Sequence, residues 1–414
     1  MTITAFSTAT GPVQKKARVL WVACGAHALH DGFTDTLYVL LPLWQAQFAL
    51  SYAAIGVLRA LYAGVMAGLQ VPTAELAPRI GGARLLAIGT AIAAVAYLLL
   101  GTSSSIAMLA VALVLGGIGS STQHPIASSL VAEAYQGPHS RGALGTYNFA
   151  GDLGKMVLPS ITAGMIALMS WRSAASVIGS VGLIGACAIL LLMRPVSSAA
   201  VLRARSDRSK PLDPSGLLHN GFPLLLTIGI IDSATRMGFL TFLPFLLRAK
   251  GAGVPEIGMA LTLVFAGGAA GKLVCGFLGA RLGILPTVLL TEGATAAGIV
   301  ALLPLSLVTS LALLPIIGIA LNGTSSVLYG TVPDLVTVRQ RERAFGVFYT
   351  GTIGAGALSP ALYGVFSDAI GLIPAMLLVA AVVLVTLPLA WQLTRVLNAL
   401  RSNPHPQSEM ETTS

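Results

Sequence analysis

The chain has 414 residues, of which 55% are hydrophobic and only 9% are charged, and its mean hydropathy is +0.84. Because a soluble domain averages about 25% charged residues, this composition excludes an ordinary soluble protein and indicates an integral membrane protein. The formal net charge is +9, so the distribution of the basic residues must decide whether nucleic acid is a partner.

Twelve stretches are long and apolar enough to cross a bilayer, which takes roughly 20 residues of helix. They are 19–42, 51–76, 84–101, 105–133, 142–168, 173–193, 220–247, 256–279, 285–304, 309–333, 344–367 and 371–394. We therefore expect an all-α integral membrane protein with twelve transmembrane helices in two pseudo-symmetric bundles of six, at 19–193 and 220–394. Segment 1–18, the polar stretch 194–219 and the tail 395–414 are predicted to be cytoplasmic, with 194–219 as the linker.

The basic residues give the orientation. With both termini inside, 17 of the 24 lysines and arginines are cytoplasmic, 3 are outside and 4 lie within spans. This excess is typical of the cytoplasmic loops of multi-pass proteins and predicts a bacterial-type inner membrane. It also accounts for the net charge without nucleic acid. The three cysteines fall within spans and are expected to be small buried hydrophobes rather than metal ligands or disulfides.

The two halves repeat each other in parallel. Adding 202 to a position in the first half gives a like residue in the second, and further along the offset is 201. The pairs include Leu41 with Leu243, Pro42 with Pro244, Ile55 with Ile257, Gly56 with Gly258, Arg79 with Arg281, Gly81 with Gly283, Glu133 with Asp334, Gly145 with Gly346 and Pro159 with Pro360. Two parallel repeats joined by a cytoplasmic linker indicate a duplicated six-helix unit.

This layout resembles the major facilitator superfamily, and local motifs add to the resemblance. AELAPRIGGAR at 74–84 is similar to the superfamily's helix 2–3 loop, usually written GxLaDrxGRr, and GFLGARLG at 276–283 is its copy. The chain departs at Pro78, where the family usually has an aspartate that helps to lock the cytoplasmic gate. The resemblance implies a transporter without enzymatic activity, whose halves rock about a central substrate site.

A narrower resemblance is to the fosmidomycin-resistance-type exporters. It is carried by HALHDGFTDTLYVLLPLWQAQFALSYAAIG at 27–56 and by GSSTQHPIAS at 119–128. The chain departs at Asp152 and Lys155, which lie in a helix that is uncharged in those exporters. The resemblance implies export, and substrate identity does not follow from it.

Charged residues inside the spans indicate a polar path through the protein. Placing one charged side chain in the hydrocarbon of a bilayer costs roughly 2.5–3.5 kcal/mol of free energy. His27, Asp31 and Asp35 recur at every fourth position and share one stripe of the first helix. A carboxylate whose surroundings alternate can carry a proton across, and histidine titrates near neutrality. The candidates for proton coupling are Asp31, Asp35, Asp152, Asp232, His27 and His30. Structural ion pairs of Asp152 with Lys155 and of Asp232 with Arg236 remain the alternative.

The cations inside the spans predict an anionic substrate, since arginine suits bidentate contacts with oxyanions. The candidate substrate-binding residues are Arg236, Lys155, Arg59, Lys272, Gln123, His124, Asn148, Asn322 and Tyr329. Alternatively, the four cations only neutralise the five acids Asp31, Asp35, Asp152, Asp232 and Glu292. The two interpretations stay open at the level of sequence.

Charged residues at the cytoplasmic helix ends are the candidate gates of alternating access. They are Arg79, Glu133, Arg141, Arg281, Asp334, Arg341 and Arg343. The expected function is secondary transport of a small organic anion together with protons, driven by the proton gradient. No other cofactor is expected, and the functional unit is expected to be a monomer. Drug or metabolite efflux by proton antiport is the first expectation, and proton-coupled uptake by symport is the alternative.

Two other classes of protein fit less well. The histidines and aspartates of the first helix match no catalytic or zinc spacing, so neither an enzyme nor a metal site is expected. A channel needs a selectivity filter and usually oligomeric symmetry, whereas charges near the midplane of a duplicated chain favour a carrier.

Overall fold

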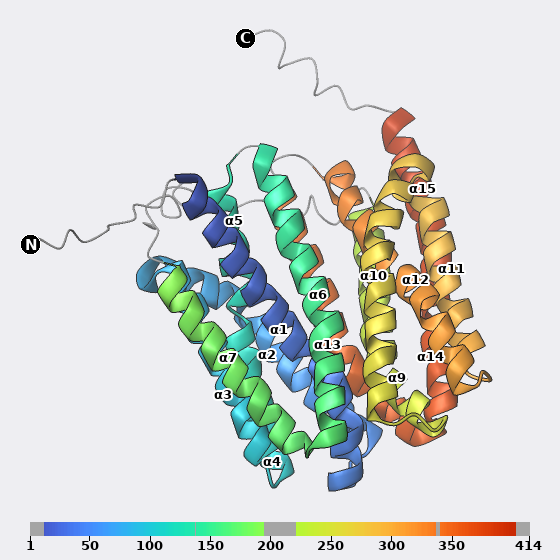
Figure 1. Ribbon diagram of the computed structural model, residues 1–414. Helices are drawn as coiled ribbons and strands as arrows, with labels where there is room; N and C mark the ends of the chain where they lie inside the picture. The colour runs from blue at the N-terminus through green and yellow to red at the C-terminus, as the bar shows by residue number, and fades with distance from the viewer. Residues whose placement is uncertain (1–11, 137, 194–220, 337–339, 403–414) are drawn as a thin grey trace, which may run out of the picture. The chain divides into compact units, whose positions relative to one another are not determined.

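The computed structural model describes residues 12–136, 138–193, 221–336 and 340–402, and within these ranges every regular element is a helix (Figure 1). The helices of the first half are α1 (Pro12–Phe48), α2 (Tyr52–Ile80), α3 (Gly82–Thr102), α4 (Ile106–Ser120), the π-helix η1 (Gln123–Ala127), α5 (Ser128–Ala134), α6 (Pro138–Leu168) and α7 (Trp171–Leu192). Those of the second half are α9 (Phe222–Ala249), α10 (Val254–Leu282), α11 (Ile284–Leu302), α12 (Leu307–Leu335), α13 (Arg341–Ile370), α14 (Leu372–Leu384) and α15 (Thr386–Ser402).

Each of the twelve predicted spans falls on one helix or on consecutive helices, so the predicted all-α fold is confirmed. Among the described residues, 10 helical segments are long and apolar enough to cross a membrane. Helices α1 and α6 are not among the 10, because the charged residues of these two helices, among them Asp31 and Lys155, lower their hydropathy. The chain is a multi-pass membrane protein, and helices α1 and α6 carry the predicted proton-coupling groups of its first half.

The chain forms two compact units. Unit 1 comprises Met1–Leu37 and Gly68–Ser209, and unit 2 comprises Tyr38–Ala67 and Lys210–Ser414. The segment Tyr38–Ala67, which spans the end of α1 and the start of α2, therefore packs with unit 2. The predicted linker at 194–219 lies outside the described residues, so the predicted domain boundary stays a prediction.

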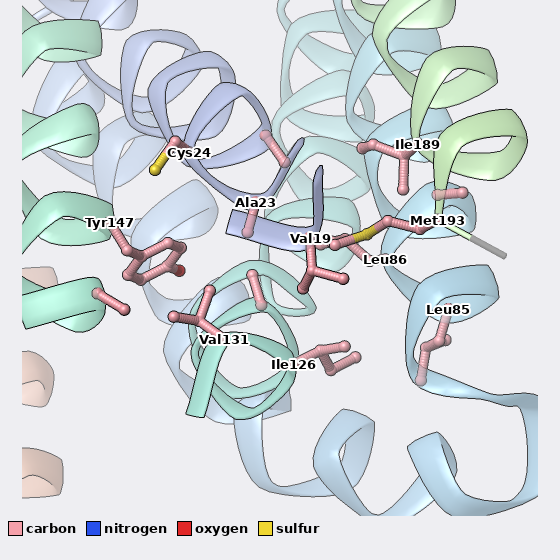
Figure 2. Packing of buried hydrophobic residues seen from close by; sticks show 14 residues of the cluster. Val19, Ala23, Cys24, Leu85, Leu86, Ile126, Val131, Tyr147, Ile189 and Met193 are labelled. Atoms are coloured by element: carbon pink, nitrogen blue, oxygen red, sulfur yellow. The ribbon is translucent and has the colours of Figure 1, made fainter. Parts of the chain in front are cut away.

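Unit 1 is built on a core shared by α1, α3, α6, α7 and the η1–α5 segment (Figure 2). Its buried side chains include Val19, Leu86, Ile126, Tyr147 and Ile189. Small residues let these helices approach closely, as is usual in membranes. A Cβ atom on Gly154 of α6 would lie 2.0 Å from the carbonyl oxygen of Ala28 on α1. The contact between α1 and α6 therefore depends on glycine.

Unit 2 has a separate core of side chains from α9, α11, α12, α13 and α15, among them Phe222, Val288 and Phe348. Helices α10 and α12 also meet at glycines, since a Cβ on Gly267 would lie 2.0 Å from the carbonyl oxygen of Pro315. Each unit thus holds its helices at backbone-contact distance. This close packing places buried polar side chains of neighbouring helices within bonding range.

Candidate functional site

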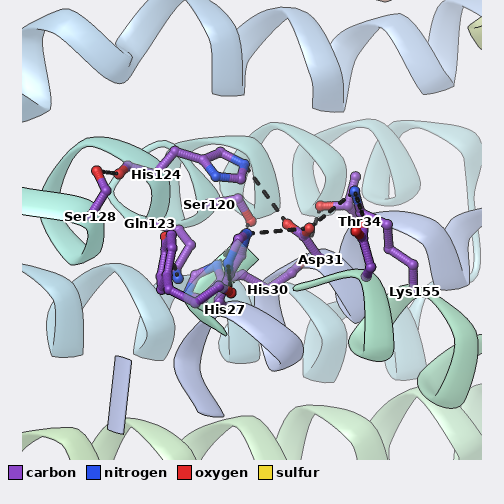
Figure 3. Close-up of polar contacts among 11 residues, drawn as sticks. His27, His30, Asp31, Thr34, Ser120, Gln123, His124, Ser128 and Lys155 are labelled. Carbon is purple, nitrogen blue, oxygen red and sulfur yellow. Dashed lines mark hydrogen bonds and ion pairs between the residues drawn. The ribbon is translucent and has the colours of Figure 1, made fainter. Parts of the chain in front are cut away.

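Three elements of unit 1 bring together five ionisable side chains, which we call the Asp31 cluster: His27 and Asp31 from α1, His124 from η1, and Asp152 and Lys155 from α6 (Figure 3). The Lys155 ammonium nitrogen lies 3.2 Å from Asp31 Oδ2 and 3.7 Å from Asp152 Oδ1. His27 Nε2 is 3.3 Å from Asp31 Oδ2, and His124 Nε2 is 3.8 Å from Asp31 Oδ1. Asp31 is therefore the centre of the cluster.

Glycine at position 151 makes room for this arrangement. A Cβ there would lie 2.6 Å from His27 Nε2 and 2.8 Å from Asp31 Oδ2. Real Cβ atoms essentially never make contacts under 3.0 Å, so a larger residue would displace the side chains of His27 and Asp31 or push α6 away from α1. Tyr147, Gly151 and Lys155 recur at every fourth position and therefore lie on one face of α6.

The π-helix η1 positions His124. Pro125 has no N–H, so it cannot donate to the carbonyl of Ser121, and the helix changes its hydrogen-bond register there. Thr73 Oγ1 of α2 lies 3.3 Å from the Ser121 carbonyl oxygen and lies closer to the carbonyl oxygens of Leu69 and Gln70 in its own helix. Isolated π turns of this kind are frequent at functional sites. Here the turn presents the imidazole of His124 to Asp31 (Figure 3).

The hydrogen bonds of His27 define which ring nitrogen carries hydrogen. Its Nδ1 lies 2.8 Å from the backbone carbonyl oxygen of Tyr147. Because a carbonyl only accepts, Nδ1 must be the donor. In a neutral imidazole the lone pair of Nε2 would then face the carboxylate of Asp31, which also only accepts. A hydrogen bond across the 3.3 Å between Nε2 and the carboxylate would therefore need a further proton, on Nε2 or on the carboxyl group.

Tyr147 and Gln123 complete the surroundings of His27. The phenol ring of Tyr147 stacks on the imidazole with 4.1 Å between centroids, and its hydroxyl accepts a 3.3 Å hydrogen bond from Gln123 Nε2. Gln123 was predicted as a site residue, whereas Tyr147 was missed. The spacing of Tyr147, Gly151 and Lys155 on α6 was the signal that could have found it.

His30 has a different environment from His27. Thr90 Oγ1 donates its hydrogen to the Leu86 carbonyl, so it accepts from His30 Nε2 at 2.9 Å. Ser120 Oγ lies 3.4 Å from Nδ1 and can donate to it. A neutral His30 is thus fully hydrogen-bonded and joins α1 to α3 and α4. Its predicted role as a proton relay stays a prediction.

Asp35 acts electrostatically on Lys155 as well. One ammonium group therefore faces three carboxyl groups, those of Asp31, Asp35 and Asp152. With both histidines neutral, the ionised group carries one positive and three negative charges. This balance favours the view that Lys155 first neutralises acids of α1 and α6, which was one of the two interpretations left open by the sequence.

Unit 2 contains a second polar group. On α9, Arg236 lies 4.0 Å from Asp232, at the predicted spacing of four residues. Glu292 of α11 is only 1% exposed and interacts electrostatically with Asp232. Sequence reasoning noted Glu292 as an acid but did not include it in the site. The repeat held the signal, because the offset of 202 that relates His30 to Asp232 also relates Thr90 to Glu292.

The remaining predicted substrate-binding residues have the following surroundings within their own units. Arg59 is buried in unit 2, where its Nη2 donates to the Tyr38 hydroxyl at 3.2 Å and its guanidinium lies over the Tyr38 ring. Asn322 donates to the Gly318 carbonyl, and Tyr329 packs on Phe348 and Tyr349. Lys272 is half-buried on α10, and Asn148 is exposed on α6.

The predicted gate residues lie at helix ends or in the last turns. Arg79 is in the last turn of α2 and Arg281 in the last turn of α10, where its guanidinium covers the Phe277 ring. Glu133 and Asp334 lie near the ends of α5 and α12, and Arg341 and Arg343 are in the first turn of α13. The side chain of Arg141 lies outside the described residues. Gating by this set stays a prediction.

One group of ligand atoms has the composition of a metal site. His27, Asp31 and His124 each offer one atom, and the three atoms lie within 4.8 Å of one another. Two imidazoles and a carboxylate suit a transition-metal ion. Lys155, however, already places a positive charge 3.2 Å from Asp31 Oδ2. The expectation of no resident metal stays a prediction.

An all-helical membrane protein that buries ionisable side chains inside its spans is built like a carrier. The family model of the Major Facilitator Superfamily matches residues 23–245 and 225–413, so the chain belongs to this superfamily of transporters and is not an enzyme. A curated relative, the probable 4-methylmuconolactone transporter of Cupriavidus pinatubonensis (strain JMP 134 / LMG 1197), is 26% identical over 90% of this chain and 88% of its own length.

Solved structures share the fold. A bacterial homologue of the human lysosomal transporter Spinster, crystallised in an inward-facing and occupied conformation, has a TM-score of 0.77 at 18% identity over 94% of this chain and 98% of its own. A mutant of the nucleoside transporter NupG has a TM-score of 0.75 at 13% identity over 92% and 99%. At these identities the likeness establishes the fold alone.

Proposed function

We propose that the protein is a secondary transporter that moves a small organic anion together with a proton, with the Asp31 cluster as the coupling site. The observation that carries this proposal is the buried pair of His27 and Asp31. His27 Nδ1 faces a backbone carbonyl and Nε2 lies 3.3 Å from a carboxylate oxygen, so a proton taken up by the pair would join the two groups. The superfamily and the relative named for a small organic molecule support the choice of secondary transport.

The cluster links the anion to the proton through Lys155. Its side chain is 30% exposed and that of His124 is 43% exposed, whereas that of Asp31 is 10% exposed. An anion that enters therefore meets Lys155 and His124 first. If the anion draws the ammonium away, Asp31 loses its cation and binds a proton more tightly. By linkage, the proton then strengthens anion binding by the same factor.

This linkage favours symport over antiport, and with an inward proton gradient it gives uptake. Export by proton antiport is the second candidate function and rests on the resemblance of residues 27–56 and 119–128 to fosmidomycin-resistance-type exporters. Efflux would require that the substrate and the proton exclude each other at the site. For either direction we propose a monomer in a bacterial-type inner membrane with both termini in the cytoplasm, following the excess of basic residues in the predicted cytoplasmic loops.

Proton movement on ligand binding distinguishes the two functions. The purified protein in weak buffer is mixed with 4-methylmuconolactone and with a panel of small mono- and dicarboxylates, and the pH of the solution is followed with an indicator dye. Proton uptake on binding is expected, and it supports symport. Proton release supports antiport, and binding without any pH change contradicts proton coupling. Transport into liposomes under an imposed pH gradient then gives the direction.

A further inference from the structure

The Asp31 cluster contains three donor atoms whose arrangement suits a metal ion (Figure 3). One donor atom from each of His27, Asp31 and His124 lies within 4.8 Å of the other two. His27 Nε2 is 3.3 Å from Asp31 Oδ2, and His124 Nε2 is 3.8 Å from Asp31 Oδ1. Two donors of a tetrahedral zinc ion, each about 2.1 Å from the metal, are about 3.4 Å apart. A small rotation of the His124 side chain, which is 43% exposed, would bring the three atoms to this spacing.

His27 is oriented as a metal-binding histidine is. Its Nδ1 donates to the backbone carbonyl of Tyr147 at 2.8 Å, and histidines that bind metals almost always donate their other ring N–H in this way. His27 Nε2 is buried and has no hydrogen-bond partner among the described residues, and the whole residue is only 4% exposed. A buried nitrogen lone pair beside the Asp31 carboxylate is a place for a cation.

Gly151 of α6 leaves space next to the same atoms. A Cβ at this position would lie 2.6 Å from His27 Nε2 and 2.8 Å from Asp31 Oδ2. A side chain there would therefore stand directly in front of both donors. Because glycine has no side chain, residue 151 does not fill the position that an ion between them would need.

The charges of the cluster also suit a divalent cation. With both histidines neutral, Lys155 brings one positive charge against the three carboxylates of Asp31, Asp35 and Asp152. One divalent ion would bring the sum to zero. Imidazole nitrogens together with a carboxylate select transition metals over Mg²⁺ and Ca²⁺, which prefer oxygen ligands alone.

The internal repeat shows that the fold does not need these donors. The offsets of 202 and 201 relate the three donor residues to Gly229, Ser233 and Ser325 of unit 2. None of the three has an imidazole or a carboxylate, yet α9 and α12 form there as α1 and the η1 segment do in unit 1. Two histidines gathered around an acid in unit 1 therefore add something other than packing.

We propose that His27, Asp31 and His124 bind an added divalent transition-metal ion such as Zn²⁺, and that the bound ion stops transport because it occupies the place of the coupling proton. The ion takes Asp31 from Lys155, whose ammonium keeps Asp152 as its neighbour at 3.7 Å. It acts as an inhibitor rather than as a resident cofactor. Binding stands on the geometry of the cluster, whereas the effect on transport rests on the function proposed above.

Binding is tested on purified protein without a histidine tag, in which the exposed Cys187 is replaced by serine. Zn²⁺ is titrated by calorimetry, and the visible absorption of bound Co²⁺ reports the ligand geometry. His27→Gln and His124→Gln should each weaken binding by more than about tenfold, since even loss of an outer-shell partner typically costs roughly 10–100-fold. His139→Gln changes an exposed histidine in the first turn of α6 and should bind as the wild type does.

Lys155→Leu gives a result of opposite sign. Removal of the ammonium frees Asp31, so Zn²⁺ should bind more tightly than to the wild type, whereas a change that only disturbed α6 would weaken binding. Unchanged affinity in both His27→Gln and His124→Gln overturns the site, and so does weaker affinity in Lys155→Leu. If the variant of the buried His27 does not fold, those of the more exposed His124 and Lys155 still decide.

Transport in liposomes tests the inhibition. Zn²⁺ should stop pH-gradient-driven transport by the wild type and by His139→Gln at the same concentration, and His124→Gln should need about tenfold more. If Zn²⁺ binds at the three residues and transport continues, the inhibitory role is wrong. If the wild type moves no protons with its substrate, the proposed function fails instead. The titration needs neither substrate nor gradient and still decides whether the metal site exists.

Discussion

At the scale of single residues, the most informative contact is the one between His27 Nδ1 and the Tyr147 carbonyl, because it fixes the hydrogen on one side of the ring. The sequence predicted that His27 and Asp31 share a helix face, and the pair is found at 3.3 Å. It could not predict the role of Tyr147, since that depends on how closely α6 approaches α1. It did predict the local ion pairs of Asp152 and of Asp232, which lie within one helix each.

Asp31→Asn should abolish proton-driven transport and leave the protein folded. The amide nearly keeps the shape of the side chain, and Lys155 keeps Asp152 at 3.7 Å, but the residue no longer binds a proton. Substrate counterflow, which needs no net proton movement, should persist. Both activities are measured in liposomes with Glu256→Gln as the control. Wild-type accumulation under a pH gradient in Asp31→Asn would contradict the coupling role.

Arg236→Ala should destabilise the protein, because it leaves the Asp232 carboxylate buried without its cation. Breaking a buried pair typically costs about 3–5 kcal/mol. The double variant with Asp232→Asn should recover most of this loss and also substrate binding, as expected for a structural pair. Thermal unfolding and ligand binding are measured for both singles and the double. If Arg236 clamps an anion, binding stays lost in the double variant, and Arg236→Lys weakens it too.

At the scale of elements, the predicted helices were found, whereas the π turn at Gln123–Ala127 was not predicted. Pro125 and the polar run before it were visible in the sequence. Whether a proline at this position leads to a π turn depends on the helices packed around it, which the sequence alone does not show. The glycine contacts between helices are of the same kind, because sequence shows a glycine but not what faces it.

Gly151→Ala should impair transport strongly, since its methyl group would lie within 3 Å of His27 and Asp31. Gly145→Ala is the matched control on the same helix, because a Cβ there meets nothing within 4 Å. Proton uptake on ligand binding and transport rates are measured for both. Equal activity of the two variants would show that α6 can shift without cost, and that the close approach at Gly151 is not needed for coupling.

At the scale of the whole molecule, duplication allowed the fold to be predicted from one sequence. The offset of 202 relates the two halves in the sequence alone. Membership of the superfamily agrees with the fold that this repeat predicts. The two halves nevertheless carry different residues at equivalent positions. Unit 1 places a neutral hydrogen bond at His30 and Thr90 and its acids around Asp31, whereas unit 2 places acids at the equivalent positions.

Duplication also predicts paired gates, because Arg79 and Arg281 occupy equivalent last turns of α2 and α10. If these arginines hold the cytoplasmic side closed, Arg79→Ala and Arg281→Ala should each favour the inward-open state. Exposed ion pairs contribute only about 0–1 kcal/mol, so each change should shift the ratio of the two states by about fivefold at most.

Distances between spin labels on the cytoplasmic helix ends measure this ratio. Cys187 is exposed and Cys24 and Cys275 are buried, so all three are first replaced by serine or alanine and labels are attached to cysteines introduced at the ends. Each arginine variant should lengthen the average distance without altering substrate affinity by more than the same factor, since both arginines lie in the last turns of their helices. Unchanged distances in both variants would assign Arg79 and Arg281 to membrane orientation alone, because cytoplasmic positive charge serves that purpose whether or not a gate exists.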